Sequence, residues 1–405
     1  MQVLAFFTMK DVKFTQGLEH FALCLHDHLC RANPGLNIIY SPLSIQTSAA
    51  MLRMGTSEGS ATAKEMDEGL RFDGRDVQEV AESFGVLLKS YEQCQDLKMV
   101  NGLYVMKGLQ VDEQFGHILE QKFCSKPMEI DFSSEQAASI INHWVESQTN
   151  NLIKDIIGSK VLAKDSRLCL VSAIHFQGKW AIRFNAKDTR EEEFFGSGKP
   201  TRVRMMHVCE NFFFAVLPKF DATALRMNYS ACNMAMIVIL PDKKSSLTSL
   251  EKQLTDISLE ALSSVMNLEK VDVKIPSFTA EFQQELSQAF ILMGMNRMFS
   301  GQAELGRILK SQESLFVSKI VHKSFIEVNE VGTEAAAATA VAATFRSMPA
   351  PQCPPKAFRA NRPFFYAIID NTHGLLFAGH FVTARVENSK HVTHVPKETD
   401  ARMKE

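Results

Sequence analysis

Hydrophobic and polar positions follow two different periods along this chain, and the period changes repeatedly. Apolar residues recur at helical spacing over 14–32, which predicts an amphipathic helix near the start. Turn residues at 33–37 precede a short strand and a second helix, expected to begin at Ser41 or Ser44 and to end at Gly55. Further helical patterns cover 60–71, 76–93, 133–157 and 281–295.

Strand patterns occur between and after these helices. They cover 97–106, 168–180, 212–217, 234–241, 271–278, 324–331 and 364–370. The alternation lacks the regular strand–helix–strand rhythm of a doubly wound sheet, and no internal repeat or low-complexity linker divides the chain. We therefore predict one α+β unit with mostly antiparallel sheets over 14–386. An N-terminal segment, 1–13, precedes this unit, and a polar tail, 387–405, follows it.

Composition narrows the classes of partner. The 405 residues are 45% hydrophobic and 22% charged, with a formal net charge of −2, so nothing favours nucleic acid or an anionic membrane as a partner. No apolar run is long enough to span a bilayer. The start of the chain has a short apolar run without a preceding basic residue or a typical cleavage site, which indicates a weak secretion signal or none.

Metal sites and catalytic sites are not expected from the motifs. The eight cysteines show no zinc-type spacing. His26 and His28 are two positions apart in a helical pattern and so do not share a face, while the histidines at 391–394 lie in the polar tail. The usual nucleophile-elbow, phosphate-loop and metalloprotease motifs are also missing. We therefore expect no metal, no cofactor and no enzymatic activity.

The segment 327–355 has an unusual composition. Between Gly332 and Thr344 nearly every side chain is small, and four prolines follow. Composition alone allows an Ala-rich surface helix or a linker, but 335–345 carries no charge, unlike most exposed helices. As a strand, the segment would place Thr333 and alternate residues on one face and Glu334 on the other. Such a strand could slide between others, and Gly332 suits a hinge.

This segment, "EVNEVGTEAAAATA", resembles the reactive-loop hinge of the serpins. Other segments resemble serpin segments and occur in serpin order. They are "NIIYSPLSIQTSAAMLRMGTSEGSATAKEM" (37–66), "INHWVESQTNNLIKDII" (141–157), "LVSAIHFQGKW" (170–180), "AMIVILP" (235–241), "VKIPSF" (273–278), "LMGMNRMFS" (292–300) and "FRANRPFFYAIIDNTHGLLFAGHF" (358–381). Together they cover about 14 to 386, and their combination is highly specific.

The resemblance implies a fold of three β-sheets and about nine helices with an exposed reactive loop at about 330–357. It also implies a monomeric inhibitor that forms a covalent 1:1 complex with its protease. After cleavage the loop inserts into the largest sheet and traps the acyl-enzyme, so the inhibitor is a suicide substrate. A non-inhibitory binding or carrier protein on the same fold is the alternative. The residues of the hinge and inserting segment are Glu330, Gly332, Thr333, Glu334, Ala335, Ala336, Ala337, Ala338 and Thr339.

The spacing usual in the family places the cleaved bond at Arg346–Ser347, seventeen residues along from Glu330 when that residue is counted. An Arg at this position suits the pocket of a trypsin-like serine protease, in which a buried carboxylate pairs with the guanidinium. Phe345 before it leaves a papain-like cysteine protease as the alternative target. Cys353, in a segment slightly longer than usual, is expected to be an exposed thiol.

The resemblance also implies a polar gate that controls opening of the large sheet. Ser41, Ser44 and His322 match its residues, and Trp180 matches the tryptophan near the end of the sheet where the loop enters. The Asn usual in the family is Ser172 here, and a hydroxyl cannot supply the two donors and the acceptor of an amide. This departure predicts an altered gate stability or insertion rate.

The location of the protein, outside the cell or in the cytoplasm, is predicted from weaker features of the sequence. An Arg–Ser bait suits extracellular cascades, so we expect a secreted protein, with a cytoplasmic one as the alternative. Asn228 begins a glycosylation sequon, "NYS", which would make a secreted form a glycoprotein.

Overall fold

A computed structural model describes the chain over residues 9–72, 74–158, 161–196, 198–243, 245–311, 313–330 and 354–384. The first predicted helix is confirmed as α1 (Met9–Ala32). The predicted strand and second helix are β1 (Ile38–Tyr40) and α2 (Pro42–Met54). The Ser41 side chain caps α2 by accepting a hydrogen bond from the backbone N–H of Ser44, and the helix ends at Gly55.

The described residues contain nine α-helices, in agreement with the expected number. After α1 and α2 they are α3 (Ala61–Gly69), α4 (Val77–Tyr91), α5 (Glu113–Phe123), α6 (Ala137–Gln148), α7 (Leu247–Glu251), α8 (Leu259–Val265) and α9 (Ser287–Leu292). No helix in these ranges is long and apolar enough to cross a membrane.

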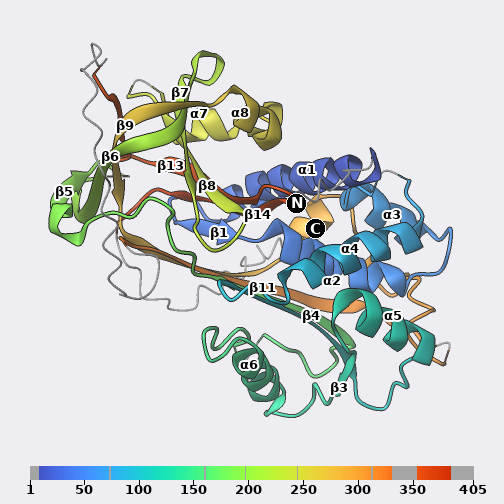
Figure 1. The fold of residues 1–405 in the computed structure, drawn as a ribbon. Coiled ribbons are helices and arrows are strands. Elements are labelled where there is room, and N and C mark those ends of the chain that lie inside the picture. Colours follow the sequence, from blue (N-terminus) through green and yellow to red (C-terminus); the bar gives the residue numbers. More distant parts are fainter. Residues whose placement is uncertain are drawn as a thin grey trace, which may run out of the picture.

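Five strands form the sheet that we call the main sheet. Its order is β10 (Phe278–Glu285), β11 (Val317–Val328), β4 (Leu168–Phe176), β2 (Leu97–Met106) and β3 (Met128–Ile130). The pairs β10–β11 and β2–β4 are antiparallel, whereas β11 and β4 run parallel in the middle of the sheet. Figure 1 shows β11 and β4 side by side, with α6 on one side of them and α2 on the other.

The remaining strands form one continuous nine-stranded network. They are β1, β5 (Arg190–Phe194), β6 (Thr201–Leu217), β7 (Ala222–Asn228), β8 (Met234–Pro241), β9 (Asn267–Pro276), β12 (Lys356–Arg359), β13 (Phe364–Asp370) and β14 (Gly374–Phe381). The long strand β6 joins two parts of it, because its beginning pairs with β5 and its end pairs with β7. The three expected sheets are therefore the main sheet and two sheets that share β6.

Two helical predictions extend too far. The pattern at 133–157 is helical only in α6, because Asn150 and Asn151 adopt positive φ angles of 53° and 62° that end a right-handed helix. The pattern at 281–295 is wrong over 281–285, which belong to β10. In β10 the buried residues Phe278, Ala280 and Phe282 alternate with exposed ones, the two-residue period of a strand.

Hydrophobic cores lie on both faces of the main sheet, and alternate residues of β4 belong to one core or the other. Leu168, Leu170 and Ile174 belong to the large core shared with α1 and α2. Cys169 and Val171 belong to a smaller core under α6. Because side chains alternate along a strand, Ser172 is the polar member of the row that faces α2.

Candidate functional site

The two central strands of the main sheet meet along a parallel boundary. Strand β11 pairs with β4 from Val317↔Leu168 to Ile326↔Phe176. Both strands point toward the same end of the sheet, which we call the mouth, and the chain leaves β11 there toward Glu330. A segment folding back from this end would run antiparallel to both strands, so it could form hydrogen bonds with each of them as an added strand.

The predicted gate residues come together across this boundary. His322 of β11 and Ser172 of β4 are register partners, and Nδ1 of His322 lies 2.9 Å from Oγ of Ser172. The backbone N–H of Ser41 donates to Nε2 of His322 at 3.1 Å. Since Nε2 accepts, Nδ1 carries the proton and donates to Ser172. The hydroxyl of Ser172 can then donate to Ser44, whose Oγ lies 2.8 Å away. The structure therefore brings these four residues into contact, and their role as a gate stays a prediction.

Two further residues complete the gate, and sequence reasoning missed both. Asn101 of β2 accepts hydrogen bonds through Oδ1 from Ser44 at 3.1 Å and from Ser48 at 2.9 Å. Asn101 is also the register partner of Ser172. The neighbouring strand β2 therefore supplies an amide oxygen to the gate, whereas β4 supplies only the hydroxyl of Ser172. The feature that could have identified Asn101 from the sequence is that it is the single amide side chain in the strand pattern of 97–106, which is largely buried.

Burial controls the protonation of the histidines along the boundary. Burial lowers the pKa of His322 to about 3, although a hydrogen bond with the backbone of Ser172 opposes this shift. Burial likewise lowers the pKa of His175 to about 4, with the Glu327 carboxylate acting in the opposite direction. The ring of His175 stacks on its register partner Phe325, with centroids 4.9 Å apart. Both histidines are therefore neutral near pH 7.

Two side-chain contacts hold the mouth of the boundary closed. Trp180, just after β4, donates its Nε1–H to the backbone oxygen of Asn329, just after β11, at 2.9 Å. Its ring stacks on Tyr229 with centroids 4.4 Å apart. Gln177 donates to Glu327 at 3.0 Å. Trp180 therefore lies at the end of the boundary from which the loop would enter, and its role there stays a prediction.

Glu330 is anchored beside the mouth. Its Oε1 accepts hydrogen bonds from Thr189 at 2.9 Å and from Arg204 at 2.7 Å, and its backbone oxygen accepts from Phe184 at 3.1 Å. Only 9% of the Glu330 side chain is exposed, against 61% for Arg204. The start of the predicted loop therefore has a fixed position relative to β4 and β11.

The other residues assigned to the loop lie outside the described residues. These are Gly332, Thr333, Glu334, Ala335, Ala336, Ala337, Ala338, Thr339, Arg346, Ser347 and Cys353. Their assigned roles stay predictions. Asn228, the sequon residue, is described and lies exposed at the end of β7.

Comparison with models of known protein families identifies the family to which this chain belongs. The family model described as serpin (serine protease inhibitor) matches residues 16–384, nearly the whole described chain. The chain belongs to the serpin family. Family membership confirms the resemblance and the α+β serpin architecture, and it agrees with the expectation that the protein is not an enzyme.

Individual relatives show how close the similarity is. Antitrypsin of Bombyx mori is 33% identical over 372 residues, covering 90% of this chain and 93% of that one. Leukocyte elastase inhibitor A of Rattus norvegicus is 34% identical over 371 residues, covering 89% and 96%. The solved structure of a cleaved serpin 42Da is 39% identical, with a TM-score of 0.82 over 92% of this chain and 99% of that chain.

Proposed function

We propose that this serpin inhibits trypsin-like serine proteases as a suicide substrate cleaved at Arg346–Ser347. The protease serine attacks the carbonyl carbon of Arg346 to form an acyl ester, and the amide nitrogen of Ser347 leaves with a proton. The freed loop then inserts between β4 and β11 before water can hydrolyse the ester. The protease, still attached to Arg346, is carried along and its catalytic site is distorted.

The observation that carries this proposal is the parallel β4–β11 boundary with Glu330 anchored at its mouth. Strands β4 and β11 are hydrogen-bonded to each other, so an antiparallel strand can fit between them only if these hydrogen bonds break. The inserted strand replaces those bonds with a full set on each of its sides, so insertion can release free energy. The names of the similar antitrypsin and elastase inhibitor support an inhibitory role.

The sequence of the loop supports both the mechanism and the choice of target. The inserting residues from Thr333 to Thr339 are Ala and Thr apart from Glu334, so they can enter a closed sheet with little steric conflict. Arg346 supplies the guanidinium that a trypsin-like pocket binds. Phe345 keeps papain-like cysteine proteases as the second class to test.

The decisive experiment mixes the full-length serpin with trypsin and analyses the products on a denaturing gel. We expect an SDS-resistant 1:1 complex together with some cleaved serpin. Arg346→Ala should lower the second-order rate of trypsin inhibition by about 100-fold or more, because the pocket carboxylate loses its partner. Cleavage without any complex would contradict the proposal and favour a binding or carrier protein. A complex with papain but none with trypsin would contradict the target class alone.

We further propose that this inhibitor acts outside the cell as a glycoprotein. Asn228 is exposed on β7, where an N-linked glycan can project into solvent. Expression of the full-length chain in a eukaryotic secretory host, with and without Asn228→Gln, tests this. We expect secreted protein whose mobility on a gel shifts after glycosidase treatment, and no shift for the variant. Retention of the unmodified protein in the cytosol would contradict it.

A further inference from the structure

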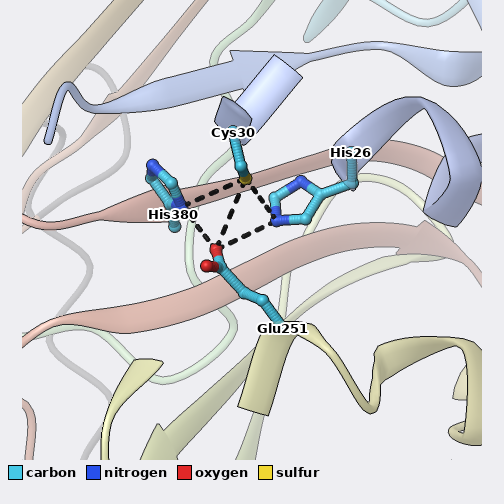
Figure 2. Close-up of side chains that lie close together, drawn as sticks. All are labelled: His26, Cys30, Glu251 and His380. Carbon is cyan, nitrogen blue, oxygen red and sulfur yellow. Dashed lines mark hydrogen bonds and ion pairs between the residues drawn. The ribbon is translucent and has the colours of Figure 1, made fainter. Parts of the chain in front are cut away.

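A second polar cluster lies away from the gate, between α1, α7 and β14. His26 and Cys30 are one turn apart on α1, Glu251 ends α7, and His380 lies on β14. Each offers one donor atom, and the four atoms all lie within 4.8 Å of one another. Figure 2 shows the four side chains converging from these separate elements. We refer to them as the His–Cys–Glu cluster.

The spacing of the donor atoms approaches that of a four-coordinate metal site. Nε2 of His26 lies 3.1 Å from Oε1 of Glu251 and 3.3 Å from Sγ of Cys30. Sγ of Cys30 lies 3.7 Å from Oε1 of Glu251 and 3.8 Å from Nδ1 of His380. A tetrahedron with zinc–ligand bonds of about 2.0–2.3 Å has edges of roughly 3.3–3.7 Å. These four distances fit a tetrahedral set after small side-chain shifts, and the contact of 2.5 Å between Nδ1 of His380 and Oε1 of Glu251 would lengthen on binding.

The orientation of His380 also favours a cation at this position. Its Nε2 lies 2.8 Å from the backbone oxygen of Leu36, an acceptor only, so Nε2 must donate. Its Nδ1 lies 2.5 Å from Oε1 of Glu251. Both ring nitrogens thus face acceptors, and a proton or a metal ion must lie between Nδ1 and the carboxylate. The bond to Leu36 is the outer contact that orients a metal-binding histidine.

The cluster is buried and contains an ionised carboxylate. His26 is 2% exposed, His380 is 5% exposed, and the side chain of Glu251 is 13% exposed. Burial disfavours ionisation of Glu251, but hydrogen bonds with His26 and His380 outweigh it and lower the pKa of this carboxyl to about 2. Burial raises the pKa of the Cys30 thiol, so the sulfur keeps its proton until a metal displaces it.

We propose that His26, Cys30, Glu251 and His380 form a structural site for one zinc ion. Two imidazoles, a thiolate and a carboxylate are the ligand types that zinc accepts, and four protein ligands leave no open position for catalysis. Binding releases the thiol proton of Cys30 and the proton shared by His380 and Glu251. The ion would cross-link α1, α7 and β14. This role is independent of protease inhibition.

The sequence did not predict this site because its four residues do not form a recognisable sequence motif. The pattern "HDH" drew attention to His28, but the partner of His26 on its own helix is Cys30, four positions on, where side chains share a face. Glu251 and His380 are far away in sequence and are brought near only by the fold. From the sequence we expected no metal site, and the arrangement of these four residues in the fold leads us to propose one.

Zinc titration of the full-length, metal-depleted protein tests the site, with a chromophoric chelator as competitor and thermal unfolding in parallel. We expect one equivalent of Zn²⁺ to bind and to raise the unfolding temperature. Cys30→Ser and Glu251→Gln should each weaken binding by about 100-fold or more, since they remove direct ligands. Glu251→Gln keeps the shape of the side chain and guards against a folding defect in the other variant. Circular dichroism establishes that each variant is folded.

Matched controls come from the same helix. Cys24→Ser and His28→Gln change the same residue types on α1 outside the cluster and should leave zinc affinity unchanged. Zinc should also protect Cys30, and not Cys24, from alkylation as measured by peptide mass spectrometry. Binding weaker than about 10 μM, or equal affinity in the wild type, Cys30→Ser and Glu251→Gln, would overturn the proposal.

Discussion

The Nδ1–H of His322 donates a hydrogen bond of 2.9 Å to Ser172 Oγ across the boundary between β11 and β4. The two residues belong to strands that must separate if the reactive loop is to enter the main sheet. Ser41, which caps α2, and Ser44 of α2 hold both partners through the Ser41 N–H and the Ser44 hydroxyl. The bond therefore connects the stability of the closed sheet to the proposed mechanism.

Ser172→Ala should destabilise the uncleaved protein. The substitution leaves the Nδ1–H of His322 and the hydroxyl of Ser44 without this buried partner, at a cost of about 1–3 kcal/mol. We expect a lower unfolding midpoint in denaturant and faster spontaneous loss of inhibitory activity on storage. Ser264→Ala, on the exposed face of α8, is the control and should leave both unchanged. An unaltered midpoint in Ser172→Ala would show that the gate contributes nothing to closure.

Thr333→Arg should convert the inhibitor into a substrate. The alternation of the loop puts Thr333 on the face that would turn inward on insertion, so a charge would have to enter the core. We expect trypsin to cleave the variant without a stable complex, and the stoichiometry of inhibition to rise accordingly. Glu334→Arg is the matched control, because the opposite face already carries a charge, and it should still inhibit. Equal inhibition by Thr333→Arg and the wild type would refute the assigned face.

Acid should weaken the uncleaved fold through its buried histidines. The pKa values of His322 and His175 lie at about 3 and about 4 in the folded protein, below the ordinary value of 6.5. Between pH 6.5 and about 4 the unfolded chain therefore binds protons that the folded chain does not. The free energy of unfolding should fall by up to about 1.4 kcal/mol per pH unit for each histidine, and neither should contribute above pH 6.5.

Denaturant midpoints at pH 7, 6 and 5 measure this effect. His322→Gln retains a donor and an acceptor without a titrating group, so it should show a smaller loss of stability between pH 7 and pH 5 than the wild type. His117→Gln is a control at an exposed histidine on α5. The same pH dependence in the wild type and His322→Gln would contradict the role given to burial of His322.

The sequence indicated most of the elements because local signals and tertiary packing agree in them. Ser41, Pro42 and Gly55 set the limits of α2, and the apolar run of β8 could only be a buried strand. The boundaries of β10 and α6 were missed where polar residues concealed a change of period. Asn101, in contrast, became part of the gate only through its register with Ser172, which no local pattern encodes.

Trp180→Phe should loosen the mouth of the boundary while keeping the aromatic stack on Tyr229. The change removes the Nε1–H that Asn329 accepts, so one link between the ends of β4 and β11 is lost. Since the cleaved form would gain a strand between β4 and β11, this link should matter mainly before cleavage. We expect the uncleaved protein to unfold at a lower temperature and the cleaved protein to change less. The other tryptophan of the chain, Trp144, lies on α6 and packs on Tyr104, so Trp144→Phe should not widen the difference between the two forms. An equal shift in cleaved and uncleaved Trp180→Phe would show that Trp180 stabilises the fold without guarding the entry of the loop.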